Sequence, residues 1–123
     1  MCSEFKRTGI ARQLVTINKK KITMYKFAMF ARLEAKPGKE DEVEQFLETA
    51  LGMAKREPTT LLWFALRLGP STFAVFDTFA DEKGRQIHLN GPIAQALMAK
   101  GPELFTKVPV IESFEVLGSK QPG

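Results

Sequence analysis

Apolar residues in the first half of the chain follow two different spacings. Residues 25–35 are rich in aromatic and aliphatic side chains and are closed by Lys36-Pro37-Gly38, which predicts a strand followed by a turn. After Gly38 the apolar positions recur every three or four residues, the spacing of one helical face. These positions are Val43, Phe46, Leu47, Ala50, Leu51 and Ala54. We therefore expect a helix here, ending before Pro58.

The second half of the chain predicts a hairpin, two helical segments and a last strand. Residues 61–68 and 72–79 are predicted strands joined through Gly69-Pro70-Ser71. A second helical stretch begins at Asp81 and breaks around Asn90-Gly91-Pro92. A short helix over residues 93–100 is expected to stop at Gly101-Pro102, and residues 108–117 are predicted to form the closing strand. The order is βαββαβ, which indicates a ferredoxin-like α+β fold with a four-stranded antiparallel sheet.

Both faces of this sheet carry apolar side chains. In the first strand Phe27, Met29 and Leu33 share one face, yet Ala28 and Phe30 lie on the other. Residues 72–79 show the same mixture. The helices can cover only one face, and a bare apolar face is larger than monomers usually tolerate. We therefore expect a homodimer in which the second copy covers the other face.

Composition indicates one ordinary globular domain. The 123 residues are 44% hydrophobic and 26% charged, which supports neither a disordered nor a fibrous chain. The longest strongly apolar stretch, residues 61–66, is far shorter than the roughly 20 residues that cross a bilayer. No secretory signal is recognisable, and the single cysteine, Cys2, cannot form an internal disulfide. We expect a cytoplasmic protein without a membrane segment.

The positive charge is concentrated in residues 1–23. This segment has six lysines and arginines against Glu4, a net charge of +5, which leaves −1 of the overall +4 for residues 24–123. The extension is interpretable as a disordered tail, as an arm for a polyanion, or as the result of a start codon read too early, with Met24 the first residue. The expected domain spans residues 24–118 and is followed by a short tail, residues 119–123.

Several short motifs occur in a characteristic order between Met24 and Leu117. They are Lys36-Pro37-Gly38-Lys39-Glu40, Glu57-Pro58, Phe73-Ala74-Val75-Phe76-Asp77-Thr78-Phe79, Asp81-Glu82, His88-Leu89 before Pro92, and Phe114-Glu115-Val116-Leu117. Together they resemble the antibiotic biosynthesis monooxygenase family of the dimeric α+β barrel superfamily. The resemblance implies a ligand cavity between sheet and helices. In some members it also implies oxidation of aromatic, polyketide-like molecules by O2, with quinones as products and with no metal or flavin cofactor.

This reaction needs few functional groups from the protein. Triplet O2 reacts slowly with closed-shell molecules, but a phenolic or anthrone-like substrate that has lost a proton is electron-rich enough to reduce O2 itself. The protein need only bind the substrate, remove the proton and exclude water.

The only histidine, His88, is the candidate catalytic base, because the unperturbed imidazole pKa lies near 6.5. Its position also matches a histidine commonly found in the family. The alternative is a surface or structural histidine.

Four further residues are candidates for binding the substrate. Trp63 and Arg67 lie four residues apart on one strand face, where an aromatic wall and a cation could hold a planar acidic ligand. Alternatively, Trp63 packs at the dimer interface and Arg67 pairs with an acid. Asp77 is an acid on a largely apolar strand face, so burial would raise its pKa unless a partner such as Arg67 held it charged. Phe79 is the fourth candidate.

Other functions are less well supported. A haem-degrading branch of the superfamily needs an asparagine in the first strand, which residues 24–35 lack, and Phe79 occupies the position of that branch's tryptophan. One histidine and one cysteine make a metal site improbable. RNA-recognition domains share the βαββαβ order, but the basic residue and glycine before the aromatic third strand are absent, so no nucleic-acid partner is expected. A dimeric protein that binds a small molecule without catalysis remains the main alternative.

Overall fold

The computed structural model describes residues 24–122; the interpretations of residues 1–23 lie outside the described residues. The elements are β1 (Phe27–Glu34), α2 (Glu40–Ala54), β2 (Thr60–Arg67), β3 (Thr72–Phe79), α3 (Glu82–Leu89), α4 (Pro92–Leu104) and β4 (Val110–Glu115). The four strands form an antiparallel sheet in the order β2-β3-β1-β4. The predicted ferredoxin-like α+β fold is confirmed, with the second helical region divided into α3 and α4.

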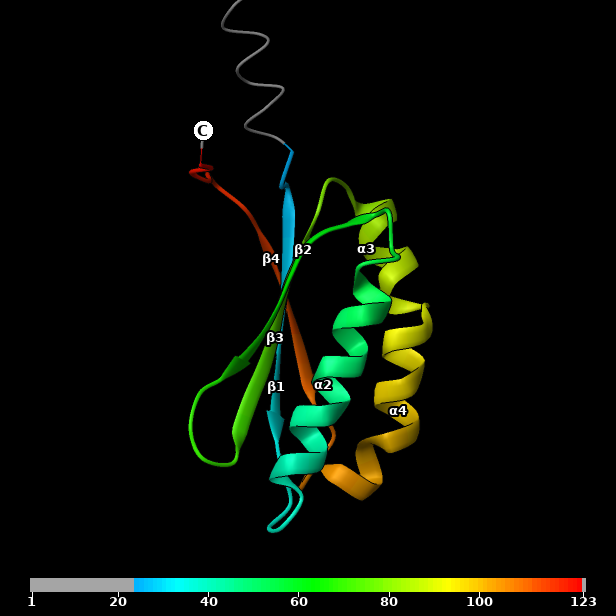
Figure 1. Cartoon of the computed structure of the whole chain (residues 1–123). Helices are drawn as coiled ribbons and strands as arrows, with labels where there is room; N and C mark the ends of the chain where they lie inside the picture. The colour runs from blue at the N-terminus through cyan, green and yellow to red at the C-terminus, as the bar shows by residue number, and fades with distance from the viewer. Residues whose placement is uncertain (1–23, 123) are drawn as a thin grey trace, which may run out of the picture.

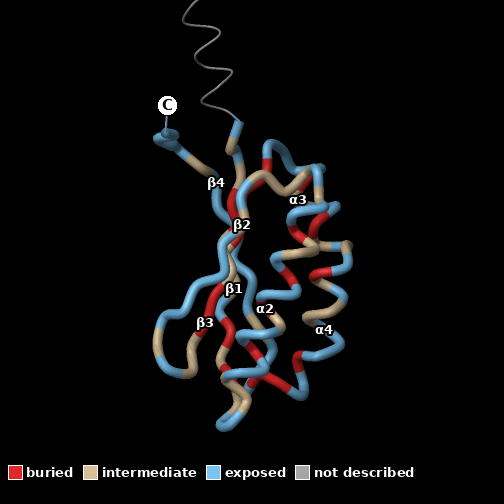
Figure 2. The backbone as a smooth tube through the Cα atoms, in the orientation of Figure 1, coloured by how far each residue is buried: buried red, intermediate tan, exposed pale blue. Residues whose placement is uncertain are grey.

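The helices lie on one side of the sheet (Figure 1). Because side chains alternate along a strand, Leu33 of β1 and Phe73 of β3 point to this side and pack against Val43 and Leu47 of α2. Ala50 of α2 belongs to a second buried cluster. That cluster also contains Ala54 and Ile93, with Trp63 packed against it. Figure 2 shows the buried residues concentrated in β1, β3 and the inner faces of the helices.

The other face of the sheet has no cover among the described residues. Phe64, Leu66 and Phe114 are exposed there, with Phe30 and Phe76 half-buried between them. Register pairs Phe30 with Phe76 and Phe76 with Phe64, so the aromatic side chains form a row across three strands. The sequence prediction of an apolar second face is confirmed.

The predicted end of the last helix is wrong. Helix α4 continues through Gly101-Pro102 to Leu104. Proline lacks an N–H and normally disrupts a helix interior, but Pro102 lies in the last turn, where the loss is limited. The Phe105 N–H donates to the Gly101 carbonyl and the Lys36 N–H to the Leu104 carbonyl, so the helix end is held from both sides.

None of the helices within residues 24–122 is both long enough and apolar enough to cross a membrane.

Candidate functional site

The His88 side chain, which comes from α3, lies between the carboxylates of Glu57 and Asp77. Its Nδ1 is 2.8 Å from Oε1 of Glu57 and its Nε2 is 3.1 Å from Oδ2 of Asp77. The Thr60 hydroxyl donates to the same Glu57 oxygen at 2.7 Å. Side chains of His88 and Asp77 are 7% and 3% exposed, and that of Glu57 12%, so the charges of this triad are removed from water. We call Glu57, His88 and Asp77 the buried triad.

The sequence of α3 explains why His88 faces the sheet. Gly84 and His88 are the buried residues of this short helix and lie four positions apart, on one helical face. A Cβ at Gly84 would lie 3.3 Å from the Thr59 carbonyl oxygen, so glycine lets α3 approach the start of β2 closely. The Asp81 side chain caps the helix by accepting from the Gly84 N–H at 2.8 Å.

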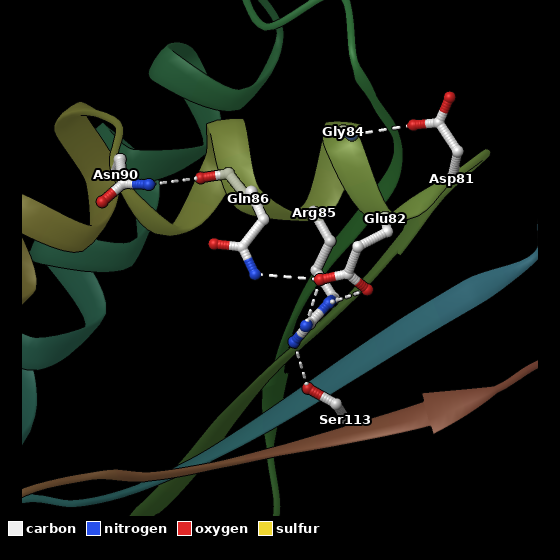
Figure 3. Close-up of polar contacts among 7 residues, drawn as sticks. All are labelled: Asp81, Glu82, Gly84, Arg85, Gln86, Asn90 and Ser113. Carbon is white, nitrogen blue, oxygen red and sulfur yellow. Dashed lines mark hydrogen bonds and ion pairs between the residues drawn. The ribbon is translucent and has the colours of Figure 1, made fainter.

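Figure 3 shows the polar contacts of α3, one of which reaches the sheet. Arg85 forms an ion pair with Glu82 and donates to the Ser113 hydroxyl of β4 at 2.7 Å. Gln86 also donates to Glu82, and Asn90 donates to the Gln86 carbonyl at the helix end. The Arg85–Ser113 contact links α3 to β4, whereas the other contacts lie within α3 and its C-terminal end.

The two carboxylates raise the pKa of His88 above its ordinary value of 6.5. Burial alone would lower this pKa, but the hydrogen bonds that the Asp77 and Glu57 carboxylates accept from the ring, together with their charge, outweigh burial. The physical reason is that an imidazolium has an N–H on each ring nitrogen and can donate to both carboxylates, whereas a neutral ring has only one. When all three groups are ionised, the buried triad has a net charge of −1.

A cavity lies beside the triad, between the sheet and the helices. It has a volume of about 50 Å³, and Asp77 and His88 are among its few polar lining residues. A water molecule needs about 10–15 Å³ on this measure, so the cavity as it stands has room for a few waters, and an aromatic ligand requires its walls to move apart. The remaining lining is mainly apolar, as expected of a pocket for a small organic molecule: Met29, Ala31, Leu33, Phe46, Leu47, Ala50, Trp63, Val75, Leu89, Ile93, Ala94, Leu97 and Ile111.

A larger groove adjoins this cavity. Leu97 of α4 and Ile111 of β4 line the cavity and also line a groove of about 400 Å³ beside the loop that joins these elements. Ile111 is 42% exposed, so Leu97 and Ile111 lie between the interior cavity and the surface groove. A ligand too large for the cavity could extend past Leu97 and Ile111 into the groove.

Two residues that line the cavity each have a buried polar atom without a hydrogen-bond partner among residues 24–122. The atoms are Oδ1 of Asp77, an acceptor, and Nε1 of Trp63, a donor. Asp77 and Trp63 are direct partners across β3 and β2, so their side chains start from neighbouring positions on the same face. Oε2 of Glu57 is also buried without a partner among the described residues, but Glu57 does not line the cavity. Buried polar atoms are usually paired, so the unpaired donor and acceptor mark this wall as the candidate binding site.

The structure brings three of the five predicted site residues together. Trp63, Asp77 and His88 all line the cavity. The partner of Asp77 is His88; the suggested pairing with Arg67 is wrong, because Arg67 instead pairs with Glu44 at 3.0 Å. Arg67 also lies over the Phe73 ring, in a groove between α2 and β2 that shares Leu47 and Trp63 with the cavity.

Phe79 supports the site without lining the cavity. Its side chain is fully buried and its ring packs against the His88 ring, with centroids 5.3 Å apart. In this arrangement, Phe79 does not contact a molecule bound in the cavity.

Sequence reasoning missed Glu57 and Thr60. The available signal was Glu57-Pro58, which we used only as a family motif. An acid next to the apolar strand 61–68 is a candidate partner for a buried histidine, but only the fold brings Glu57 to a residue 31 positions away.

Across residues 24–122 no group of three or more histidine, cysteine, aspartate or glutamate residues is arranged to hold a metal ion. The buried triad does not converge on one point, because its carboxylates bind opposite nitrogens of the imidazole.

The chain is similar to several proteins of known structure. It is 55% identical to the NE2512 protein of unknown function from Nitrosomonas europaea, with 82% of this chain and 98% of that protein covered and a TM-score of 0.79. A "putative antibiotic biosynthesis monooxygenase" from Caulobacter crescentus is 20% identical, with coverage of 82% and 98% and a TM-score of 0.65. Another so named, from Nitrosomonas europaea, is 12% identical, with coverage of 76% and 91% and a TM-score of 0.68. No protein-family model and no curated protein matches the chain. The likeness to the last two structures confirms the predicted family resemblance at the level of the fold.

Proposed function

We propose that this chain, which belongs to the same family as the Nitrosomonas europaea protein of unknown function, is a cofactor-independent monooxygenase for a small aromatic substrate. The observation that carries the proposal is the buried triad of Glu57, His88 and Asp77 against an otherwise apolar cavity. A buried base beside an apolar site can remove a proton from a bound molecule while water is excluded. The fold shared with structures named as antibiotic biosynthesis monooxygenases supports the same reaction class.

The reaction balances without an added reductant. The triad accepts a proton from an anthrone-type CH2 group or a phenol, and the resulting anion transfers one electron to O2. For the CH2 case, the carbon radical and superoxide combine to a peroxide, and loss of water with cleavage of the O–O bond leaves a C=O group. One substrate and one O2 thus give one quinone and one water. The proton that the triad took up returns to the leaving oxygen.

A homodimer is part of this proposal. The face of the sheet away from the helices exposes Phe64, Leu66 and Phe114, an apolar surface of the kind that a second copy covers. A two-fold dimer would pack these faces together and leave the two cavities, on the helical sides, as separate sites.

Oxygen uptake tests the proposed activity. Protein treated with chelator is mixed with a panel of anthrones and hydroquinones, and O2 consumption is recorded with an electrode. The expected result is consumption of one O2 per anthrone oxidised, above the rate without protein. A compound that binds, as seen by native mass spectrometry, with no O2 consumed across the panel would favour the non-catalytic binding protein instead.

A further inference from the structure

The polar atoms of the cavity wall restrict what the cavity can bind. Both ring nitrogens of His88 are engaged by carboxylates, Nδ1 by Glu57 and Nε2 by Asp77. His88 therefore lines the cavity without a free nitrogen to offer a ligand. Of the two triad carboxylates, that of Asp77 belongs to a cavity-lining residue; its Oδ1 has no hydrogen-bond partner among residues 24–122, and the residue is only 2% exposed.

Trp63 supplies the complementary group. Its indole Nε1 is buried without a partner and can only donate. Trp63 and Asp77 are paired across neighbouring strands and both line the cavity, so a ligand in the cavity lies next to both residues. Such a ligand needs a donor for Asp77 and an acceptor for Trp63, joined to an apolar body that fits the remaining walls.

The charge of the site narrows this class further. When all three groups are ionised the buried triad has a net charge of −1, and among residues 24–122 no lysine or arginine lines the cavity. A carboxylate or other anion would face Asp77 in a site with little water, where like charges repel strongly. An uncharged molecule avoids this repulsion and still makes both hydrogen bonds.

We infer that the cavity selects an uncharged aromatic molecule that donates a hydrogen bond to Oδ1 of Asp77 and accepts one from Nε1 of Trp63, with His88 and Glu57 as positioning residues. The inference rests on the proposed function in taking the cavity as the substrate site. It assigns direct substrate contact to Asp77, whereas the sequence predicted His88 as the base. In a phenolic substrate, the O–H that donates to Asp77 would be the group whose proton is lost in the oxidation.

Three probes of similar size and shape separate the elements of this class. Benzamide has a donor and an acceptor, acetophenone has only the acceptor, and benzoate is an anion. Calorimetric titration of the full chain at pH 7.5 is expected to show benzamide binding about 10-fold more tightly than acetophenone, because it adds a hydrogen bond to a charged group. No heat of binding is expected with benzoate. Equal binding of benzamide and acetophenone, tighter binding of benzoate, or no binding of any probe would overturn the inference.

The chain has one tryptophan and therefore one indole N–H resonance. Both benzamide and acetophenone should shift this resonance, since both carry the acceptor. An indole resonance that does not move at saturating benzamide would contradict the assigned contact.

Variants assign the contacts to residues. Asp77→Leu is expected to remove the preference for benzamide, while Asp41→Leu, at an exposed acid of α2, should keep it. His88→Gln retains an N–H donor for one carboxylate and should keep most of the preference. Loss of the preference in His88→Gln together with its survival in Asp77→Leu would overturn the assignment. If Asp77→Leu does not fold, the comparison of the three probes on the unaltered chain still tests the inference.

The binding test is independent of turnover. A preference for benzamide without O2 uptake on the substrate panel would leave this inference standing and remove the oxidation. O2 uptake together with equal binding of benzamide and acetophenone would support the oxidation and overturn this inference.

Discussion

At the scale of single residues, His88 stabilises the fold by satisfying two buried carboxylates. In His88→Ala, Glu57 and Asp77 would remain buried without their cationic partner, at a cost of about 3–5 kcal/mol in the free energy of unfolding. His88→Gln retains one donor and should lose less. Urea denaturation of the two variants measures the difference, and equal stability of His88→Ala and the unaltered chain would show that the carboxylates do not need the imidazole.

The raised pKa of His88 predicts how stability changes with pH. The pKa of the folded state lies above the unfolded value of about 6.5, so the stabilisation is fully present below pH 6.5 and is lost as pH rises through the folded pKa. The single imidazole should give one NMR titration with a midpoint above 6.5. Glu57→Gln should lower this midpoint, since it removes one of the two carboxylates. A midpoint at or below 6.5 in the unaltered chain would contradict the double contact.

Residue types alone indicated part of the site. The sequence has one histidine, one tryptophan and one acid on a largely apolar strand, and each is unusual enough to be selected as a candidate. These residues, His88, Trp63 and Asp77, all line the cavity. Arg67 could not be placed in this way, because strand periodicity gives the face of a side chain but not which end of the sheet it occupies. Glu57 required the tertiary fold, since it belongs to the turn after α2.

At the scale of elements, glycines within and before α2 should respond oppositely to alanine. Gly52 lies inside α2 and a Cβ there meets nothing within 4 Å, so Gly52→Ala should stabilise by about 0.5–1 kcal/mol. Gly38 has φ of 84°, which alanine adopts only with strain, so Gly38→Ala should destabilise by about 1–2 kcal/mol. Thermal unfolding of both variants checks the signs. Destabilisation by Gly52→Ala would contradict the open environment described for it.

The order of elements could be predicted because the spacing of apolar residues changes at Gly38, at Pro58 and at Asp81. The helix end at Gly101-Pro102 could not, because a local breaking signal was outweighed by tertiary contacts. Leu104 and Phe105 are buried in the main core, and Lys36 binds the last turn. Burial beyond the proline thus extends α4 past the residues that would end an isolated helix.

At the scale of the whole molecule, the exposed aromatic face predicts the assembly. Phe64 is 48% exposed on the edge strand β2, on the opposite side of the sheet from the cavity. Light scattering after size exclusion should give twice the mass of one chain, and Phe64→Glu should give a single chain because a charge would be buried at the interface. Lys100→Glu, on exposed α4, is the matched control and should remain dimeric. A monomeric unaltered chain would leave the apolar face unexplained.

The central claim is that the buried triad removes the proton that starts the oxidation, and the initial rate of O2 consumption tests it most directly. With an anthrone substrate, Asp77→Asn is compared with Asp41→Asn, an exposed aspartate in the first turn of α2. Loss of a general base should slow the Asp77→Asn variant by about 10²–10⁴-fold at a matched folded fraction, with Asp41→Asn unchanged. An Asp77→Asn rate equal to that of the unaltered chain, or no O2 consumption by any form, would contradict the account.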